Sequence, residues 1–277
     1  MHNDAVTGPL ISAAELRDHL ASQRVTLLDV RYRMGSSTGA AEHAEAHLPG
    51  AAYVDLDADL ASPAGEGGRH PLPDPAVFGE AMRRAGVRLD RPVVVYDDWS
   101  AHAAGRAWWL LRFHGHPDVR VLDGGLAAWR EEDGELESGI VSSEAGDFAC
   151  SGQAGMTVVD AGRVLDVDVL IDARAAERYR GETEPVDPVA GHIPGAVSVP
   201  TSRNLREDGC FRSTEELRAI YAEVGAVPGA DVATYCGSGV TAVHDLIALE
   251  VAGVRAALYP GSWSGWITDP TRPVATG

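Results

Sequence analysis

Two segments of the chain decide the fold, because each occurs twice. In the second half, VDVLIDAR (167–174) is followed by GHIPGAVSVP (191–200). In the first half, VTLLDVR (25–31) is followed by AHLPGAAYVDL (46–56). Asp29 in LLDV and Asp172 in LIDA lie 143 positions apart. A domain that occurs twice accounts for a chain of 277 residues, since a single domain has roughly 100–200 residues.

Each copy alternates predicted strands and helices. The runs VTLLDV and VVVY (93–96), and VDVLID and VATY (232–235), are almost continuously apolar, as expected of strands that are buried on both faces. Ser12 with Glu15, and Ser213 with Glu216, have the spacing of a capping box, which predicts a helix after each serine. The pattern therefore predicts an α/β fold in which each copy is a mostly parallel sheet with helices on both faces.

The two copies are expected to form separate domains joined by a linker. The segment 131–155 is rich in Gly, Ser and acidic residues and has little apolar periodicity. We therefore predict a first domain at 1–140, a linker at 141–156 and a second domain at 157–277.

Composition excludes several classes of protein. The chain has 41 acidic and 23 basic residues and a formal net charge of −18, and it has no basic run, which disfavours nucleic acid and anionic membrane surfaces as partners. No apolar stretch reaches the roughly 18 residues of a membrane helix, and the N-terminus lacks the pattern of a signal peptide, so we expect a cytoplasmic protein. The three cysteines have neither disulfide nor zinc spacing, and we expect no metal and no cofactor.

The candidate nucleophile stands where the two copies differ. After VVVY the first copy has Asp97, whereas after VATY the second has Cys236, followed by Gly237, Ser238 and Gly239. Ligands of open α/β sheets bind beyond the carboxyl ends of the strands, where Cys236 is predicted to lie. A glycine-rich loop directs backbone N–H groups toward the sulfur and the following helix adds its positive end, so both favour the thiolate.

Two other interpretations of this loop remain. Cys236 can be a buried small hydrophobic residue, which is a common fate of cysteine. A cysteine phosphatase would need an Arg at the sixth position after the Cys to grip the phosphoryl oxygens, and that position is Ala242.

The paired D-x-R and H-[LI]-P-G-A segments and the loop CGSGVT resemble the tandem rhodanese-domain sulfurtransferases over nearly the whole chain, and the loop is similar to the 3-mercaptopyruvate type. The resemblance implies that the first domain, with Asp97 in the cysteine position, is catalytically silent. It implies that Cys236 takes a sulfane sulfur from a small anionic donor as a persulfide and passes it to a thiol or cyanide acceptor, with a thioredoxin-like reductant as a possible partner.

The resemblance also implies roles for individual residues. Ser238 matches a loop serine that forms a relay with a His and an Asp, here His70 and Asp57, and such a relay would protonate the enolate left by mercaptopyruvate. Arg178 matches the arginine that binds the anionic group of the donor. The remaining loop residues are expected to surround the donor: Gly237, Gly239, Val240 and Thr241.

One departure leaves the donor open. The mercaptopyruvate type has a second arginine shortly after a Glu-Pro pair, but here Glu184 and Pro185 are followed by Val186 and Asp187. Thiosulfate therefore stays an alternative donor, and a non-catalytic rhodanese module that only carries a persulfide or binds a partner is the alternative from another class. Because the protein is acidic, we expect the cleft to be a local positive region built from Arg178, backbone donors and a helix end.

The other polar residues favour structural interpretations. The pairs His43/His47 and His114/His116 lack a third metal ligand, and the histidines of the paired turns, His47 and His192, recur in both copies. Trp108 and Trp109 are expected in the core or at the domain interface, Cys210 in an exposed loop, and Arg174 and Arg180 in solvent.

Overall fold

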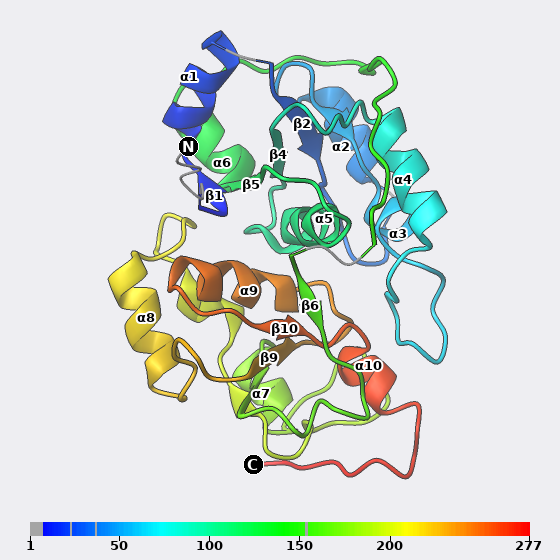
Figure 1. Cartoon of the computed structure of the whole chain (residues 1–277), viewed down its shortest axis with the longest axis vertical. Coiled ribbons are helices and arrows are strands. Elements are labelled where there is room, and N and C mark those ends of the chain that lie inside the picture. The colour runs from blue at the N-terminus through cyan, green and yellow to red at the C-terminus, as the bar shows by residue number, and fades with distance from the viewer. Residues whose placement is uncertain (1–7, 23, 37, 153–154) are drawn as a thin grey trace.

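The computed structural model describes residues 8–22, 24–36, 38–152 and 155–277, and it consists of two α/β domains stacked on each other (Figure 1). In the first domain, a five-stranded sheet has the order β1-β5-β4-β2-β3 with all neighbouring strands parallel. Its strands are β1 (Leu10–Ile11), β2 (Thr26–Asp29), β3 (Ala52–Tyr53), β4 (Val93–Tyr96) and β5 (Val119–Leu122). Its helices are α1 (Ala13–Ser22), α2 (Gly39–Glu45), α3 (Leu56–Asp59), α4 (Pro75–Arg84), α5 (His102–Phe113) and α6 (Gly125–Glu131).

The second domain repeats this topology. Its parallel sheet has the order β6-β10-β9-β7-β8, which is the first order with each strand replaced by its counterpart. The strands are β6 (Thr157–Val158), β7 (Val169–Asp172), β8 (Val197–Ser198), β9 (Val232–Tyr235) and β10 (Ala257–Leu258). The helices are α7 (Ala176–Tyr179), the 3-10 helix η1 (Thr201–Asn204), α8 (Thr214–Ala222), α9 (Ala242–Val251) and α10 (Ser262–Trp266).

Alternating strand residues enter different hydrophobic clusters, because successive side chains of a strand point to opposite faces. In β4, Val93 and Val95 pack into one cluster with α4 and α5, whereas Val94 and Tyr96 pack into another with α1 and α6. Helices therefore cover both faces of the sheet, which confirms the predicted fold class. The capping boxes are also confirmed: Ser12 and Glu15 bond each other reciprocally at the start of α1, and Ser213 and Glu216 do so at α8.

Helices α5 and α9 join the domains, and they lie between the two sheets in Figure 1. One hydrophobic cluster contains buried residues of both helices, including Trp108 and Trp109. A Cβ at Gly105 would lie 3.0 Å from Val243, so the glycine allows the helices to approach closely. Arg112 and Glu250 pair across the same interface at 2.7 Å. This shared core holds the domains in a fixed relation, so loops of one reach the loops of the other.

The repeated D-x-R motif forms a buried ion pair in each domain. Arg174 donates two hydrogen bonds to Asp172 Oδ2 and Oδ1 with its Nη2 and Nε, and Arg31 does the same to Asp29. Arg174 is only 4% exposed, so the expectation that it is solvated is wrong. The carboxylate at the end of the strand provides the partner that a buried guanidinium requires.

The segment after α6 runs along the first domain (Figure 1). Between Glu131 and Thr157, apart from residues 153–154, which lie outside the described residues, it contains no helix or strand. Phe148 is nevertheless fully buried, edge-on to the ring of Phe78. The predicted linker thus contributes to the first core before it enters the second domain.

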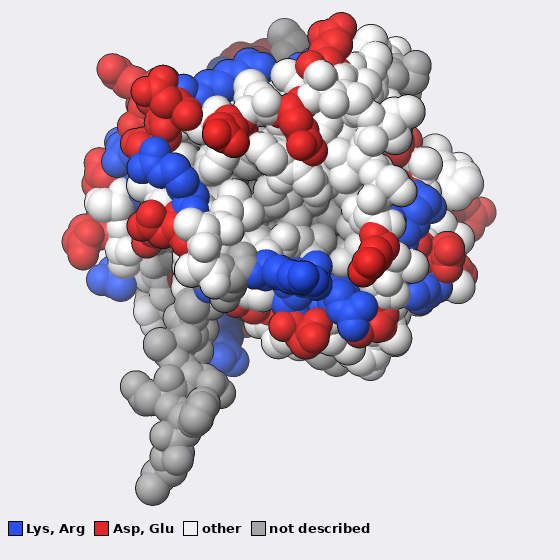
Figure 2. Space-filling view, turned by 90° about the horizontal axis from the view of Figure 1, so that it is seen from above, with Lys and Arg blue, Asp and Glu red and all other residues white. Residues whose placement is uncertain are grey.

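Surface charge and helix length bear on possible partners. Figure 2 shows the molecule from above relative to Figure 1, and on that face basic side chains are interspersed with acidic ones and form no broad basic area. None of the helices in the described ranges has the length and hydrophobicity needed to cross a membrane.

Candidate active site

Cys236 lies directly after the central strand β9, and the loop 236–241 leads into α9. The cysteine is 1% exposed, and its Sγ accepts a hydrogen bond of 3.2 Å from the backbone N–H of Gly239. Gly239 has a φ of +78°, and a Cβ there would lie 2.5 Å from the carbonyl oxygen of Pro260. Only glycine fits this position, and the loop can therefore curl its backbone around the sulfur.

Helix α10 holds the loop from behind. The backbone N–H of Cys236 donates to Ser262 Oγ at 3.1 Å. In return, the N–H groups of Trp263 and Ser264 donate to the carbonyl oxygens of Cys236 and Gly237, both at 2.9 Å. These bonds fix the position of the thiol without using its sulfur.

Ser238 of this loop forms a Ser-His-Asp chain with His70 and Asp57 of the first domain. His70 Nδ1 lies 2.8 Å from Ser238 Oγ, and His70 Nε2 lies 3.3 Å from Asp57 Oδ1. Burial lowers the pKa of His70, the charges of Arg106 and Arg69 lower it further, and Asp57 opposes them in part. Since the pKa lies below its ordinary value, His70 is neutral at pH 7 and one ring nitrogen can accept the Ser238 proton.

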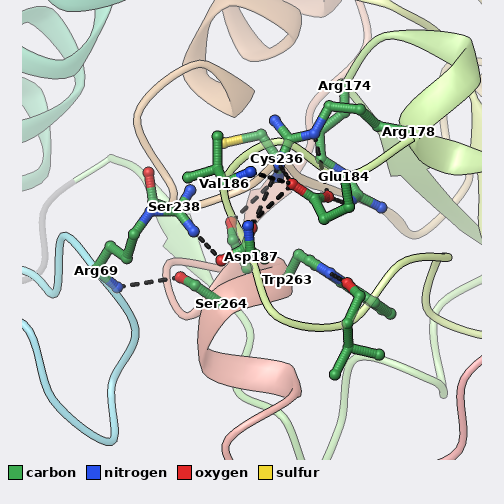
Figure 3. A network of polar contacts seen from close by, with 12 residues as sticks. Arg69, Arg174, Arg178, Glu184, Val186, Asp187, Cys236, Ser238, Trp263 and Ser264 are labelled. Atoms are coloured by element: carbon green, nitrogen blue, oxygen red, sulfur yellow. Dashed lines mark hydrogen bonds and ion pairs between the residues drawn. The ribbon is translucent and has the colours of Figure 1, made fainter. Parts of the chain in front are cut away.

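Two guanidinium groups lie beside Gly237, and both bind Asp187 (Figure 3). Arg178 also makes a bidentate pair with Glu184, at 2.7 and 3.1 Å. The second group belongs to Arg69 of the first domain, and sequence reasoning missed it because nothing local distinguishes this loop arginine. The cations of the expected positive region are thus present, but two carboxylates, Asp187 and Glu184, pair with them, so a net positive cleft stays a prediction.

The pKa values of the two carboxylates, Glu184 and Asp187, are shifted in opposite directions. Burial alone would raise the pKa of Glu184, but hydrogen bonds from Arg178 and from two backbone N–H groups outweigh it and leave the pKa lowered. Burial raises the pKa of Asp187, and the neighbouring Glu184 adds to this effect while Arg69 opposes it.

Arg106 is the third arginine near the site and, like Arg69, it was not predicted. It is fully buried on α5 and donates to the carbonyl oxygens of Gly239 and His70, at 3.0 and 3.1 Å, so it connects the loop of Cys236 to the loop of His70. Burial lowers its pKa to about 10, and its charge interacts with Cys236. A lone arginine within the apolar run AAGRAWWLL was a signal for such a role.

These groups surround a cavity of about 140 Å³. A cavity of this size has room for a donor of a few heavy atoms. Cys236, Ser238, His70 and Arg178 line it, and so do the predicted loop residues Gly237, Val240 and Thr241. Gly239 and Asp57 do not line the cavity: the N–H of Gly239 binds the sulfur of Cys236, and Asp57 contacts His70. The remaining wall consists of Tyr32, Met34, Arg69, Trp99 and Val186.

The equivalent position of the first domain holds no thiol. Asp97 follows β4, and its carboxylate accepts backbone N–H groups at 2.9 Å from Trp99, Ala101, Ala103 and Ala104. The carboxylate fills the cradle that in the second domain surrounds Cys236.

The remaining sequence candidates have structural contacts. Cys210 is half-buried against Gly124 rather than exposed, and burial raises its pKa and that of Cys150, which disfavours their thiolates. His47 and His192 each bond a backbone carbonyl through Nδ1 at 2.7 Å. Within the described part of the chain, no three His, Cys, Asp or Glu side chains are grouped to hold a metal ion.

The fold and the site define a protein of two α/β domains in which Cys236 lies at the carboxyl end of strand β9 and faces a cavity lined by both domains. The rhodanese-like domain model matches residues 12–132 and 159–269, and the chain belongs to this family. This confirms the expected family and fold.

The relatives cover almost the whole chain. It is 46% identical to the putative thiosulfate sulfurtransferase SseB of Mycobacterium tuberculosis, over 97% of each chain. It is 45% identical to the probable 3-mercaptopyruvate sulfurtransferase of Pseudomonas aeruginosa, over 97% of this chain and 98% of the relative. The crystal structure of SseA from Escherichia coli, a 3-mercaptopyruvate sulfurtransferase, matches with a TM-score of 0.80 and 36% identity, over 93% of this chain and 100% of that one.

Proposed function

We propose that this protein is a sulfurtransferase that moves a sulfane sulfur from 3-mercaptopyruvate, through a persulfide of Cys236, to a thiol or cyanide acceptor. One observation carries the proposal: a single small cavity joins Cys236, the hydroxyl of Ser238 with its partner His70, and the guanidinium of Arg178. The cavity thus combines a nucleophile, a proton relay and an anion-binding group.

The first half-reaction balances within the site. The Cys236 thiolate attacks the donor sulfur, the S–S bond forms, and the C–S bond breaks with its electron pair leaving as the pyruvate enolate. The proton of the donor thiol ends on the enolate carbon, so that the products are pyruvate and the Cys236 persulfide anion. In the second half-reaction, cyanide attacks the outer sulfur and leaves as thiocyanate, which restores the thiolate.

Ser238, His70 and Asp57 move that proton. Ser238 lies on the loop of the nucleophile and lines the cavity, so its hydroxyl delivers the proton to the enolate carbon. Neutral His70 exchanges the proton with Ser238 through Nδ1, and Asp57 accepts a hydrogen bond from the other nitrogen and orients the ring.

The two domains divide these tasks. We propose that the domain at 1–140 is catalytically silent, since Asp97 replaces the thiol, and that it contributes Asp57, His70 and one wall of the cavity. The domain at 157–277 holds the nucleophile. A thioredoxin-like reductant as acceptor and a cytoplasmic location stay predictions.

Thiosulfate is the second candidate donor. It is supported by the segment Glu184–Asp187, which lacks the second arginine, and by the name of the Mycobacterium tuberculosis relative.

Steady-state kinetics with both donors and cyanide decides between them. We expect kcat/KM for mercaptopyruvate to exceed that for thiosulfate by about tenfold or more. The reverse ratio would assign thiosulfate, and no turnover of either donor would favour the non-catalytic module. Cys236→Ser is the control and is expected to be inactive with both.

A further inference from the structure

The two arginines beside Gly237 come from different domains and share one carboxylate. Asp187 accepts from Arg69 Nη1 with Oδ1 and from Arg178 Nη2 with Oδ2 (Figure 3). The Asp187 side chain is only 3% exposed, whereas those of Arg69 and Arg178 are 30% and 19% exposed. A buried carboxylate therefore holds two guanidinium groups that remain accessible from the cavity.

Each guanidinium keeps nitrogen atoms that Asp187 and Glu184 do not use. Within the described residues, Arg69 Nη2 and Arg178 Nη1 have no protein acceptor. A Cβ at Gly237 would lie 2.8 Å from the first and 3.7 Å from the second, so both nitrogens face the space that this glycine leaves open next to Cys236. Two N–H donors that converge on one point match the two oxygens of a carboxylate.

Arg69 is held in this position by the second domain. Its backbone N–H donates to Ser264 Oγ at 3.0 Å. The preceding Gly68 has a φ of +102°, and a Cβ there would lie 2.8 Å from both Ser264 Oγ and the carbonyl oxygen of Gly261. The loop thus docks on α10, the helix that also braces Cys236.

We propose that Arg69 and Arg178 form a two-guanidinium subsite that binds the carboxylate of a 2-oxo acid, with Asp187 as the positioning residue that keeps both forks turned toward the cavity. The identity of the ligand rests on the proposed function, whereas the subsite itself rests on this geometry. Arg69 supplies from the first domain the second cation that the segment after Glu184 lacks, and it determines how tightly the donor binds.

The test separates anion binding from sulfur transfer by using pyruvate, the 2-oxo acid without the sulfur. Its dissociation constant is measured by calorimetry for the full-length wild type, Arg69→Gln, Arg69→Lys and Arg178→Gln. Arg180→Gln is the matched control, because Arg180 is an exposed neighbour paired with Glu182. We expect Arg69→Gln and Arg178→Gln each to weaken pyruvate binding roughly tenfold or more, since a hydrogen bond to a charged group is lost. We expect Arg69→Lys, which keeps the charge and loses the fork, to lie between, and Arg180→Gln to match the wild type.

Donor kinetics completes the test. In Arg69→Gln we expect KM for mercaptopyruvate to rise by a similar factor while kcat changes less, because the lost interaction is made in ground state and transition state alike. Pyruvate binding and KM within about twofold of the Arg180→Gln control would overturn the subsite. Arg69-dependent pyruvate binding without turnover of either donor would uphold the subsite and refute the proposed function.

Discussion

His70 Nδ1 lies 2.8 Å from Ser238 Oγ, although the two residues are 168 positions apart and belong to different domains. The contact exists because α5 and α9 share one core and because Arg106 binds a backbone carbonyl of each loop. In the proposed mechanism the catalytic unit is therefore the pair of domains, and we expect the first domain to be required even though Asp97 stands in place of its thiol.

The relay predicts a donor-selective defect. Ser238→Ala and His70→Ala are expected to lower kcat with mercaptopyruvate by roughly 10²–10⁴, the usual contribution of general acid–base catalysis. Thiosulfate serves as the internal control, because sulfite leaves without protonation at carbon. Steady-state kinetics with cyanide measures both reactions. An equal loss with both donors would refute the relay and indicate damage to the loop.

The ionisation of His70 predicts a pH dependence. Burial lowers its pKa below the ordinary value of roughly 6.5, so the neutral form persists into mildly acidic solution. As the pH falls through this lowered pKa, His70 becomes protonated and can no longer accept the Ser238 proton. We expect kcat for mercaptopyruvate to fall on that acidic limb, and we expect His70→Gln to lose the limb. A limb that is unchanged in His70→Gln would assign it to another group.

Asp97 is predicted to stabilise the first domain. Its carboxylate accepts four backbone N–H groups, and Asp97→Ala would leave these buried donors without partners. We expect the free energy of unfolding to fall by roughly 3 kcal/mol. The adjacent Asp98→Ala removes only a partly exposed pair with Arg33 and should cost less than about 1 kcal/mol. Denaturant titration compares the two, and an equal loss would contradict the capping role.

The buried Asp245 is expected to lower the stability of the second domain as the pH rises. Burial raises its pKa to about 8, and its Oδ2 has no partner. The unfolded carboxyl ionises near its ordinary pKa, so the folded state loses stability as the pH rises from about 4 toward 8. Asp245→Asn removes this loss, so its stability advantage over the wild type should be roughly 4 kcal/mol larger at about pH 8 than at about pH 5. The exposed Asp208→Asn should show no such gain. A difference between Asp245→Asn and wild type that does not vary with pH would contradict the raised pKa.

Much of this fold was predictable because the chain contains the same domain twice, so the two copies can be compared with each other. The repeat located both sheets and showed that Asp97 and Cys236 occupy equivalent positions, and the capping boxes marked the starts of α1 and α8. The resemblance singled out Ser238, His70 and Asp57, and the structure places them in one chain of contacts.

Contacts between distant segments were not predictable. Arg69 and Asp187 meet across the domains, and no local pattern brings a loop of the first domain to a turn of the second. Arg174 was misjudged because a sequence shows the charge of a side chain and not the buried carboxylate that compensates it. The half-buried state of Cys210 likewise depends on packing between the domains.

The most direct test of the central claim is the site of the transferred sulfur. The protein is treated with mercaptopyruvate without an acceptor, digested and examined by mass spectrometry. We predict one additional sulfur atom on Cys236, none on Cys150 or Cys210, and its loss on addition of cyanide together with formation of thiocyanate. Sulfur on another cysteine, or transfer that persists in Cys236→Ser, would contradict the account.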